Sequence, residues 1–539
     1  MIIPTPSSVV PADPGRLGFR LDERVGIDAP SALRPAAEWL RDAIAPATGL
    51  PLPIGPRARV VRFRVDEGLA DEEYTLDVQV DGVLVAAGGP AGALYAAQTF
   101  VQLLPPEVFR QAAVPRADWT VPAVTIRDRP RFGWRGVMLD VVRHFMPKRE
   151  LMRFIDLMAM HKLNVLHLHL TDDQGWRVEI RRYPRLTGVG AWRRESQVGA
   201  GATAPTDGRP HGGFYTQQDL KEIVRYAERR SVTVVPEIET PGHVRAALAA
   251  YPHLGVTGEV LDVWTRWGIC EDVLNVEDST VEFFCGVLDE VMEIFPSAVI
   301  GIGGDECPTV QWRNSPRTQE LMRERGLADE RDVHTWFLGR LAAHLRGAGR
   351  RAFAWDELLE GETPDDAVVA SWRGSTGTSI AARRHIDVVS CPDDFVYLDY
   401  RQSDAAAEPI PVSVPTPMER VLAFDPVPAD LDEALVHHVL GGQAHLWTEH
   451  MDHPRTIDYF AFPRLCAVAE VLWSGSPTDP QSFIDAMERE HLPRLDAVGV
   501  EYRPQDGPLP WQQRPGIPGR PETVEERAEH IAHLVAKMA

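Results

Sequence analysis

The sequence predicts an α/β protein: a (β/α)₈ TIM barrel catalytic domain preceded by a small α+β domain. Short apolar runs alternate with helical patterns over roughly 340 residues, which is typical of βα units. About eight such runs occur, the number that closes a barrel. An open doubly wound sheet is the competing fold, and it predicts a G-x-G-x-x-G loop after the first strand. Because the sequence has no such loop there, we expect the barrel.

Changes of pattern and proline-rich stretches divide the chain into three predicted units. Residues 1–127 form an N-terminal α/β domain, residues 128–478 the barrel, and residues 479–539 a Pro-rich segment that ends in a helix. In the first unit the predicted strands are 60–65, 74–80 and 83–87. Asp81-Gly82 indicates a two-residue hairpin turn between the last two of these strands.

The barrel strands are predicted from apolar runs bounded by turn residues. They are residues 137–142, 165–170, 232–238, 298–303, 352–355, 367–371, 387–390 and 439–444. Predicted helices lie between them: one begins at Pro147, a second is capped by Thr216 with Asp219, and a third is capped by Ser279 with Glu282. A last helix is expected over residues 522–538.

Composition excludes several classes of protein. The chain has 56 Lys and Arg against 78 Asp and Glu, a net charge of −22, and this acidic balance disfavours nucleic acid or an anionic membrane as partner. The 5 Cys residues form no C-x-x-C pair, which excludes a disulfide scaffold or zinc ribbon. No apolar run reaches the roughly 18 residues that a membrane span needs. The first 15 residues do not resemble a secretory signal, so we expect a cytoplasmic protein, with a mature exported form as the alternative.

Polar and aromatic residues follow the predicted strands where each apolar run stops. Catalytic groups of barrel enzymes lie past the carboxyl ends of the strands, so these residues are expected to surround one pocket. The endings are Thr171-Asp172-Asp173, Glu239 to His243, Asp305-Glu306, Trp355, Trp372, and Trp447 with Glu449.

Asp305 and Glu306 are the most informative of these endings. They follow a buried strand and two glycines, which let the backbone turn tightly beside a ligand. Two adjacent carboxylates in a dry site cannot both ionise easily, so one should keep its proton near neutral pH. Glycosidases need an acid and an ionised partner, but consecutive residues seldom straddle a sugar at the required separation. We therefore expect the nucleophile to belong to the substrate, such as a 2-acetamido carbonyl. Three Trp at strand ends would suit a box around its methyl group.

The motifs together resemble glycoside hydrolase family 20, the β-N-acetylhexosaminidases. The resemblance spans about residues 130–475, and residues 1–125 resemble the α/β domain that precedes the barrel in this family. It rests on residues 134–140, 167–176, 236–243, 303–306 and 443–449. It implies a retaining exo-β-N-acetylhexosaminidase that releases terminal GlcNAc or GalNAc by substrate-assisted catalysis through an oxazolinium intermediate, with no cofactor and no metal.

The resemblance also implies catalytic roles. Glu306 would be the general acid/base, and Asp305 would hold the acetamido N–H. Tyr397 would donate its hydroxyl to the acetamido carbonyl. Asp172 and His243 would form a relay that orients Glu306 and tunes its pKa.

Substrate-binding roles follow from the same resemblance. Arg135 would bind the O3 and O4 hydroxyls of the terminal sugar, Glu449 would accept from O4, and Asp399 from O6. The acetamido group would be walled by Trp355, Trp372 and Trp447. The partner is expected to be a small-molecule or oligosaccharide substrate with a terminal N-acetylhexosamine.

Two positions depart from the family pattern. Glu239 stands where the family usually has Asp, which leaves the geometry of the relay open. The stretch after Asp399 lacks the Trp that often floors the site for a second sugar, so preference for extended chitobiose-like substrates is open as well.

Other functions were weighed against this one. A metal-dependent hydrolase could use His167, His169, Asp172 and Glu239, although the two histidines lie before the strand end. A sugar-binding protein without activity would be expected to lack Glu306. A disaccharide-releasing relative would need room beyond the first sugar. The sequence does not distinguish GlcNAc from GalNAc, or fix the linkage, the natural glycan, the oligomeric state or the role of the C-terminal helix.

Overall fold

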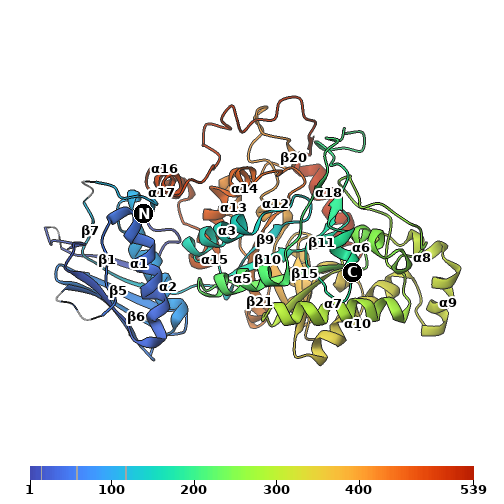
Figure 1. Ribbon diagram of the computed structural model, residues 1–539, viewed down its shortest axis with the longest axis horizontal. Helices are drawn as coiled ribbons and strands as arrows, with labels where there is room; N and C mark the ends of the chain where they lie inside the picture. Colours follow the sequence, from blue (N-terminus) through green and yellow to red (C-terminus); the bar gives the residue numbers. More distant parts are fainter. Residues whose placement is uncertain (14, 56, 58, 116–117, 539) are drawn as a thin grey trace.

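The N-terminal domain is a mixed sheet with two helices packed on it. The computed structural model describes residues 1–13, 15–55, 57, 59–115 and 118–538 (Figure 1). The sheet has the order β1-β8-β5-β6-β4-β3, and α1 and α2 pack against each other. β5 and β6 pair as the predicted hairpin, with Gln79 opposite Gly82, so the turn lies one residue earlier than expected. The bounds are β1 Ser8–Pro11, β3 Val25–Asp28, α1 Arg34–Thr48, β4 Arg59–Val65, β5 Tyr74–Gln79, β6 Gly82–Ala87, α2 Pro90–Gln102 and β8 Val124–Asp128.

The second domain is a closed barrel of parallel strands, as predicted. Its order is β10-β15-β16-β17-β18-β19-β21-β9, so each strand pairs with the next along the chain and the last pairs with the first. Each predicted strand coincides with one of the observed strands. They are β9 Trp134–Asp140, β10 Val165–His169, β15 Thr233–Thr240, β16 Val299–Gly303, β17 Arg351–Trp355, β18 Val368–Ser371, β19 Asp387–Ser390 and β21 Val439–Leu446.

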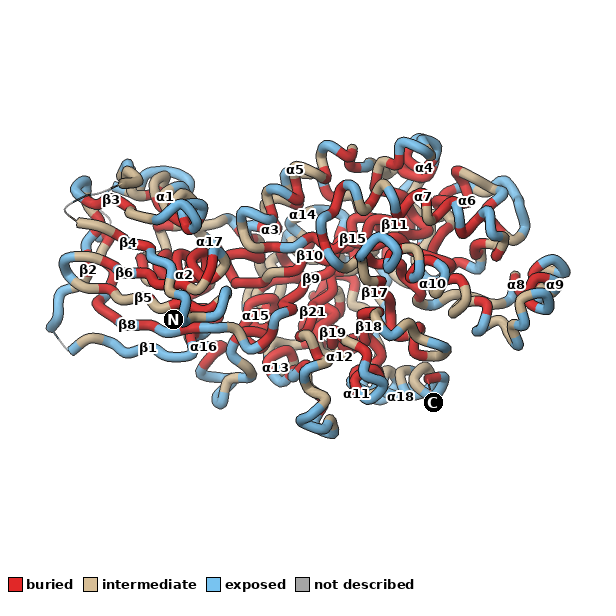
Figure 2. Tube along the Cα trace, turned by 90° about the horizontal axis from the view of Figure 1, so that it is seen from below, coloured by how far each residue is buried: buried red, intermediate tan, exposed pale blue. Residues whose placement is uncertain are grey.

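Amphipathic helices surround the barrel and bury their apolar stripes on it (Figure 2). In α3 the residues Leu151, Phe154, Ile155 and Met158 form the predicted buried face. The capping box of Thr216 and Asp219 begins α5 as expected, whereas α7 begins at Asp278 without a side-chain cap, so the Ser279 cap was wrong. The main helices are α3 Lys148–Met160, α5 Gln217–Glu228, α7 Asp278–Ile294, α10 Glu330–Gly347, α11 Thr376–Arg383 and α15 Arg464–Ser474.

Shorter elements connect these units. The strands are β2 Phe19–Arg20, β7 Thr120–Val121, β11 Thr171–Asp172, β12 Gly175–Trp176, β13 Trp192–Arg193, β14 His211–Gly212, β20 Val412–Ser413 and β22 Arg520–Pro521. The helices are α4 Arg185–Gly188, α6 Arg245–Ala250, α8 Val310–Asn314, α9 Pro316–Arg325, α12 Asp393–Val396, α13 Met418–Leu422 and α14 Pro454–Ala461. Among the described residues, no helix is both long and apolar enough to cross a membrane.

Residues 479–538 lie in two places. The helices α16 (Pro480–Glu490) and α17 (Leu492–Val498) lie beside the N-terminal domain, where Arg494 Nη2 donates to the Gln102 carbonyl over 2.8 Å (Figure 1). The last helix, α18 (Val524–Val535), lies on the other side of the barrel, against α12. The chain between them therefore crosses from one domain to the far edge of the other.

Arg135 is buried where the two domains meet. It lies near the start of β9, and its guanidinium donates to Glu72 Oε1 over 2.7 Å and to the Tyr95 hydroxyl over 2.9 Å. Its Nε donates to the Lys162 carbonyl over 2.9 Å, and its Cζ lies 4.9 Å from the ring centre of Trp473. All these partners lie at the amino-terminal end of the barrel or in the N-terminal domain, so Arg135 holds the two domains together.

Replacing Arg135 should destabilise the fold. Arg135→Met leaves Glu72 and two backbone carbonyls without their buried partner, and we expect the free energy of unfolding to fall by about 3 kcal/mol. Arg149→Met is the matched control: its side chain is 91% exposed, and the expected change is below about 0.5 kcal/mol. Urea unfolding of the three proteins measures this difference. Equal stabilities for the two variants would contradict the assignment.

Candidate active site

The carboxyl ends of the barrel strands surround one cavity of about 500 Å³, called the inner cavity. Each predicted site residue except Asp172 and Arg135 lines it. The predicted lining residues are His243, Asp305, Glu306, Trp355, Trp372, Tyr397, Asp399, Trp447 and Glu449, and Arg143 joins them. The rule that polar residues follow strand ends therefore located this cavity correctly.

The loop after β16 brings Asp305 and Glu306 to the cavity. Gly303 and Gly304 have φ values of +73° and +103°, a region that glycine adopts without strain. A Cβ on Gly303 would lie 1.9 Å from Glu239 Oε2, so the backbone can approach Glu239 only without a side chain. Glu306 itself has φ +45°, which is uncommon for a residue with a side chain. The tight turn places two consecutive carboxylates at one cavity wall.

His243 stands between two pairs of carboxylates. Its Nδ1 lies 3.1 Å from Asp173 Oδ2 and 3.3 Å from Asp172 Oδ1. Its Nε2 lies 3.8 Å from Asp305 Oδ2 and 3.7 Å from Glu306 Oε2. The predicted relay of Asp172 and His243 is thus brought together, and Asp173 joins it as a partner that the sequence reasoning missed.

Burial and charge shift the pKa values of this group in different directions. Burial opposes charge on His243, but Asp172 and Asp305 outweigh it and raise the pKa of the imidazole well above its usual value. Burial, with a contribution from Glu306, raises the pKa of Asp305 to about 6. Burial acts the same way on Glu306, but the nearby cationic imidazole of His243 outweighs it and lowers the pKa. Of these two adjacent carboxyls, Asp305 therefore holds its proton more strongly than Glu306.

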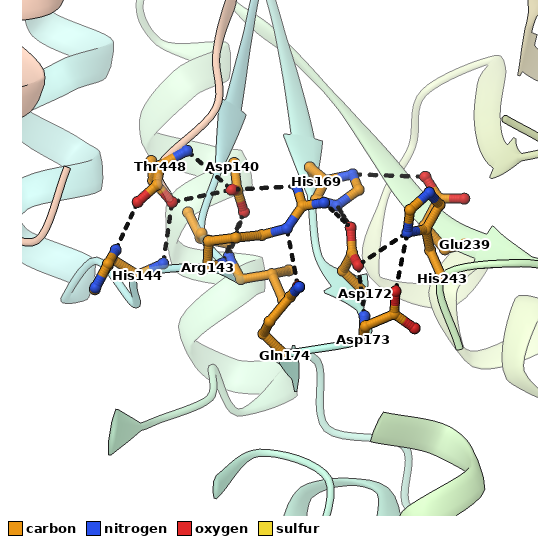
Figure 3. Close-up of polar contacts among 12 residues, drawn as sticks. Asp140, Arg143, His144, His169, Asp172, Asp173, Gln174, Glu239, His243 and Thr448 are labelled. Carbon is orange, nitrogen blue, oxygen red and sulfur yellow. Dashed lines mark hydrogen bonds and ion pairs between the residues drawn. The ribbon is translucent and has the colours of Figure 1, made fainter. Parts of the chain in front are cut away.

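Arg143 supplies a cationic group near the carboxylates of the cavity (Figure 3). Its Nη2 lies 2.7 Å from Asp172 Oδ2, and its Nε donates to Gln174 Oε1 over 2.9 Å. Asp140, the last residue of β9, lies 3.5 Å from Nη1, and Cζ lies 4.9 Å from the ring centre of Trp447. These contacts fix the guanidinium at the carboxyl end of β9.

Aromatic rings form one wall of the inner cavity. The ring centres of Trp355 and Trp447 are 5.9 Å apart, those of Tyr397 and Trp447 are 6.5 Å apart, and those of Trp372 and Tyr397 are 6.5 Å apart. They come from the ends of different strands, β17, β18 and β21, and from the loop after α12. Such spacings make a box for a small apolar group or a surface for a pyranose.

Two acidic groups that line the same cavity have raised pKa values. Burial, followed by the charge of Glu449, raises the pKa of Asp399 well above its usual value. Burial also raises the pKa of Glu449. Among the described residues, the buried atoms Asp305 Oδ1, Asp399 Oδ1 and Trp355 Nε1 have no hydrogen-bond partner. Polar atoms of this kind around a cavity are available to a polar ligand.

A second layer of charges lies beneath the cavity floor. His169 Nδ1 lies 2.5 Å from Glu237 Oε2, and His169 Nε2 lies 3.0 Å from Asp172 Oδ2. Burial opposes charge on His169, but Glu237 and Asp172 outweigh it and raise its pKa to about 10. Glu239 Oε1 lies 3.7 Å from His169 Nδ1, and among the described residues neither of its oxygens has a hydrogen-bond partner. Burial raises its pKa well above the usual value.

Contacts within this layer bear on the metal-site alternative. Both ring nitrogens of His169 are engaged by carboxylates, and Asp172 is bound by Arg143 and His169. Two members of the set His167, His169, Asp172 and Glu239 are therefore committed to ion pairs within the protein, which disfavours a metal ion there.

The expectation that Arg135 binds substrate is wrong. Its guanidinium is committed to Glu72 and Tyr95 at the opposite end of β9. Residues at the two ends of a strand cannot line the same pocket. Catalytic groups of barrel enzymes follow the carboxyl ends of the strands, and the arginine that follows the carboxyl end of β9 is Arg143. Asp140 and Arg143 are the functional candidates that could have been found by that rule.

Paired carboxylates, an aromatic box and further buried acids at the mouth of a (β/α)₈ barrel are typical of a hydrolase that acts on sugars. Comparison with known proteins gives the family. The catalytic domain of glycosyl hydrolase family 20 matches residues 132–476, and domain 2 of the same family matches residues 1–129. The chain belongs to glycosyl hydrolase family 20.

Relatives and solved structures agree with this family. A beta-hexosaminidase of Porphyromonas gingivalis is 39% identical over 526 residues, which cover 96% of this chain and 65% of the relative. The β-N-acetylhexosaminidase of Streptomyces coelicolor A3(2) is 32% identical with a TM-score of 0.81, covering 96% and 98% of the two chains. The exo β-N-acetylglucosaminidase of Vibrio harveyi, solved with N-acetylglucosamine, is 32% identical with a TM-score of 0.82, covering 93% and 78%. This chain spans about two thirds of the length of the P. gingivalis relative.

The two buried glutamates of β15 should respond differently to loss of charge. Glu237 is ionised between His167 and His169, so Glu237→Gln breaks a buried ion pair and should lower the free energy of unfolding by about 3 kcal/mol. Glu239 keeps its proton, so Glu239→Gln replaces one neutral group by another. The free energy of unfolding should therefore change by less than about 1 kcal/mol at pH 7. Chemical unfolding of both variants tests this contrast, and similar losses would contradict the charge states.

Proposed function

We propose that this protein is a retaining exo-β-N-acetylhexosaminidase that releases terminal GlcNAc or GalNAc from the non-reducing end of glycans. The observation that carries the proposal is that Asp305 and Glu306, adjacent in the chain, both approach His243 Nε2 within 4 Å beside an aromatic box. The family and the N-acetylglucosamine in the V. harveyi relative support the same activity.

The arrangement favours substrate-assisted catalysis. Carboxylates that converge on one imidazole nitrogen lie on the same side of the site, whereas a carboxylate nucleophile must face the acid across the bond. The 2-acetamido carbonyl oxygen of the substrate would attack C1, and the leaving oxygen would take the proton of Glu306. Water then attacks C1 of the oxazolinium intermediate, gives its proton to Glu306, and releases the sugar with its original anomeric configuration.

Asp305 and Tyr397 are positioned to guide the acetamido group. The free atom Asp305 Oδ1 can accept the amide N–H, and the negative charge stabilises the cationic intermediate. The Tyr397 hydroxyl can donate to the carbonyl oxygen, while Trp355, Trp372 and Trp447 enclose the methyl group. These contacts hold the carbonyl oxygen against C1. The entropy of orienting the acetamido group is then lost on binding rather than in the chemical step.

Arg143 takes the role that the sequence had given to Arg135. Its guanidinium lines the inner cavity with Glu449 and Asp399, so it can donate to the O3 and O4 hydroxyls while the two acids bind O4 and O6. These groups close the cavity around one sugar, which supports release of a single terminal residue.

Glu306 must gain a proton to act as an acid, although its pKa is lowered next to His243. Its side chain is 38% exposed, so a bound sugar that covers it would remove water and raise its pKa. His243, fixed by Asp172 and Asp173, orients the carboxyl during this change. Substrate binding thus prepares the acid.

Replacing the two carboxylates should have different effects. Glu306→Gln removes the acid, so kcat/KM should fall about 10³-fold or more for a disaccharide and less for a 4-nitrophenyl glycoside, whose leaving group needs little protonation. Asp305→Asn should lower kcat about 10² to 10³-fold with a smaller change in KM. Glu282→Gln, an exposed residue of α7, is the control. Steady-state kinetics that leave either site variant near the control would refute the assignment.

The pH profile should report Asp305. Because its pKa is raised to about 6, the carboxylate needed in the reaction forms only above that pH, and kcat/KM should decline as the pH falls through about 6. Asn does not titrate, so the decline near pH 6 should disappear from the residual activity of Asp305→Asn. Rates measured between about pH 4 and 8 check this. An unchanged acid limb in the variant would assign it to another group.

A further inference from the structure

The C-terminal strap, residues 503–535, crosses the mouth of the barrel. It begins beyond the 132–476 range that matches the catalytic domain of the family. Its strand β22 pairs with β20, with Arg520 opposite Val412, and the Ala200 amide donates to the Pro518 carbonyl over 2.8 Å. Two separate loops of the barrel mouth are thereby tied together through the strap.

The helix α18 is anchored beside the inner cavity. Arg527 Nε donates to Asp393 Oδ2 over 2.6 Å, and the Tyr400 hydroxyl donates to the same oxygen over 2.9 Å. Asp393 is buried, so this ion pair is shielded from water. The Tyr400 ring centre lies 5.6 Å from that of Tyr397, which connects the anchor to the aromatic box.

One face of α18 lines a second cavity of about 660 Å³, called the side cavity. His530 and Leu534 are four residues apart and share that face, and Lys537, just past the end of the helix, also lines the cavity. Glu306 and Trp372 line both cavities. The side cavity therefore adjoins the inner cavity at the acid carboxyl and at Trp372.

The charges of the side cavity largely cancel. Arg331 lies 3.0 Å from Asp329, and Arg373 lies 2.6 Å from Glu360, so much of the charge is paired within the lining. Ile269 and Leu534 add apolar surface. A lining with donors and acceptors of both signs and apolar patches suits a neutral, hydroxyl-rich ligand, and the volume is in the range of small-molecule sites.

We propose that α18 is a specificity-determining element that forms the leaving-group site of this enzyme and takes a neutral second sugar. This inference rests on the proposed function, because it requires Glu306 to protonate the oxygen between the two sugars. The strap thus carries part of the substrate recognition.

The test narrows the side cavity without changing the inner one. Leu534→Trp and His530→Trp each place an indole in the side cavity, and Glu529→Trp places one on the exposed part of the same helix as the control. Substrates are 4-nitrophenyl N-acetyl-β-glucosaminide and disaccharides with terminal N-acetylglucosamine on a neutral hexose in β-1,2, β-1,3, β-1,4 and β-1,6 linkage. The readout is the ratio of kcat/KM for the best disaccharide to kcat/KM for the aryl glycoside.

We expect this ratio to fall about tenfold in Leu534→Trp and His530→Trp and to stay within about twofold of wild type in Glu529→Trp. Thermal unfolding verifies that the variants fold. If one of the two cavity variants does not fold, the other provides the test. A ratio unchanged in a folded cavity variant, or a wild-type protein that cleaves the aryl glycoside but no disaccharide, would overturn the inference and leave the proposed function intact. A wild-type protein that cleaves neither kind of substrate would instead refute the proposed function.

Discussion

The charged imidazole of His243 is the interaction on which the site depends. It is buried between Asp172 and Asp173 on one side and Asp305 and Glu306 on the other. Without that positive charge the site would hold several carboxylates in a low-dielectric environment, where each would take up a proton. With it, Glu306 is ionised and Asp305 titrates near pH 6. The charge of His243 therefore explains how Asp305 and Glu306, although adjacent in the chain, can differ in protonation.

The opposite end of the barrel explains why this arrangement can be held rigidly. Arg135 joins β9 to Glu72 of the N-terminal domain, and Lys162 Nζ lies 2.7 Å from Asp128 Oδ2 in a fully buried pair. Both cations precede barrel strands or begin them, so they fix the amino-terminal ends. The carboxyl ends of the strands, which do not make these contacts between the domains, carry the polar groups of the cavity. This division between stability at one end and chemistry at the other is general for such barrels.

Much of this could be predicted from the sequence. The barrel strands are buried on both faces and read as continuous apolar runs, so their positions, and the polar residues after them, were visible. The prediction that Arg135 binds substrate was wrong because it rested on the motif that contains the residue. A motif does not show whether an arginine lies at the amino-terminal or the carboxyl end of its strand. Arg143, three residues past the end of β9, differs only in position along the strand.

Features that depend on contacts between distant segments could not be predicted. The contribution of Asp173 follows from its hydrogen bond with His243 Nδ1, and the lower pKa of Glu306 follows from the charge of the same imidazole on its other side. The side cavity combines α18 with loops more than 150 residues away in the chain, and no local pattern in residues 503–535 indicates it.

The central claim is that the amide of the substrate, rather than a side chain, attacks the anomeric carbon. The most direct measurement compares kcat/KM for 4-nitrophenyl N-acetyl-β-glucosaminide with that for the corresponding 4-nitrophenyl β-glucoside, which lacks the amide. The account predicts a preference for the acetamido sugar of about 10⁴-fold. Similar rates for the two substrates would contradict it.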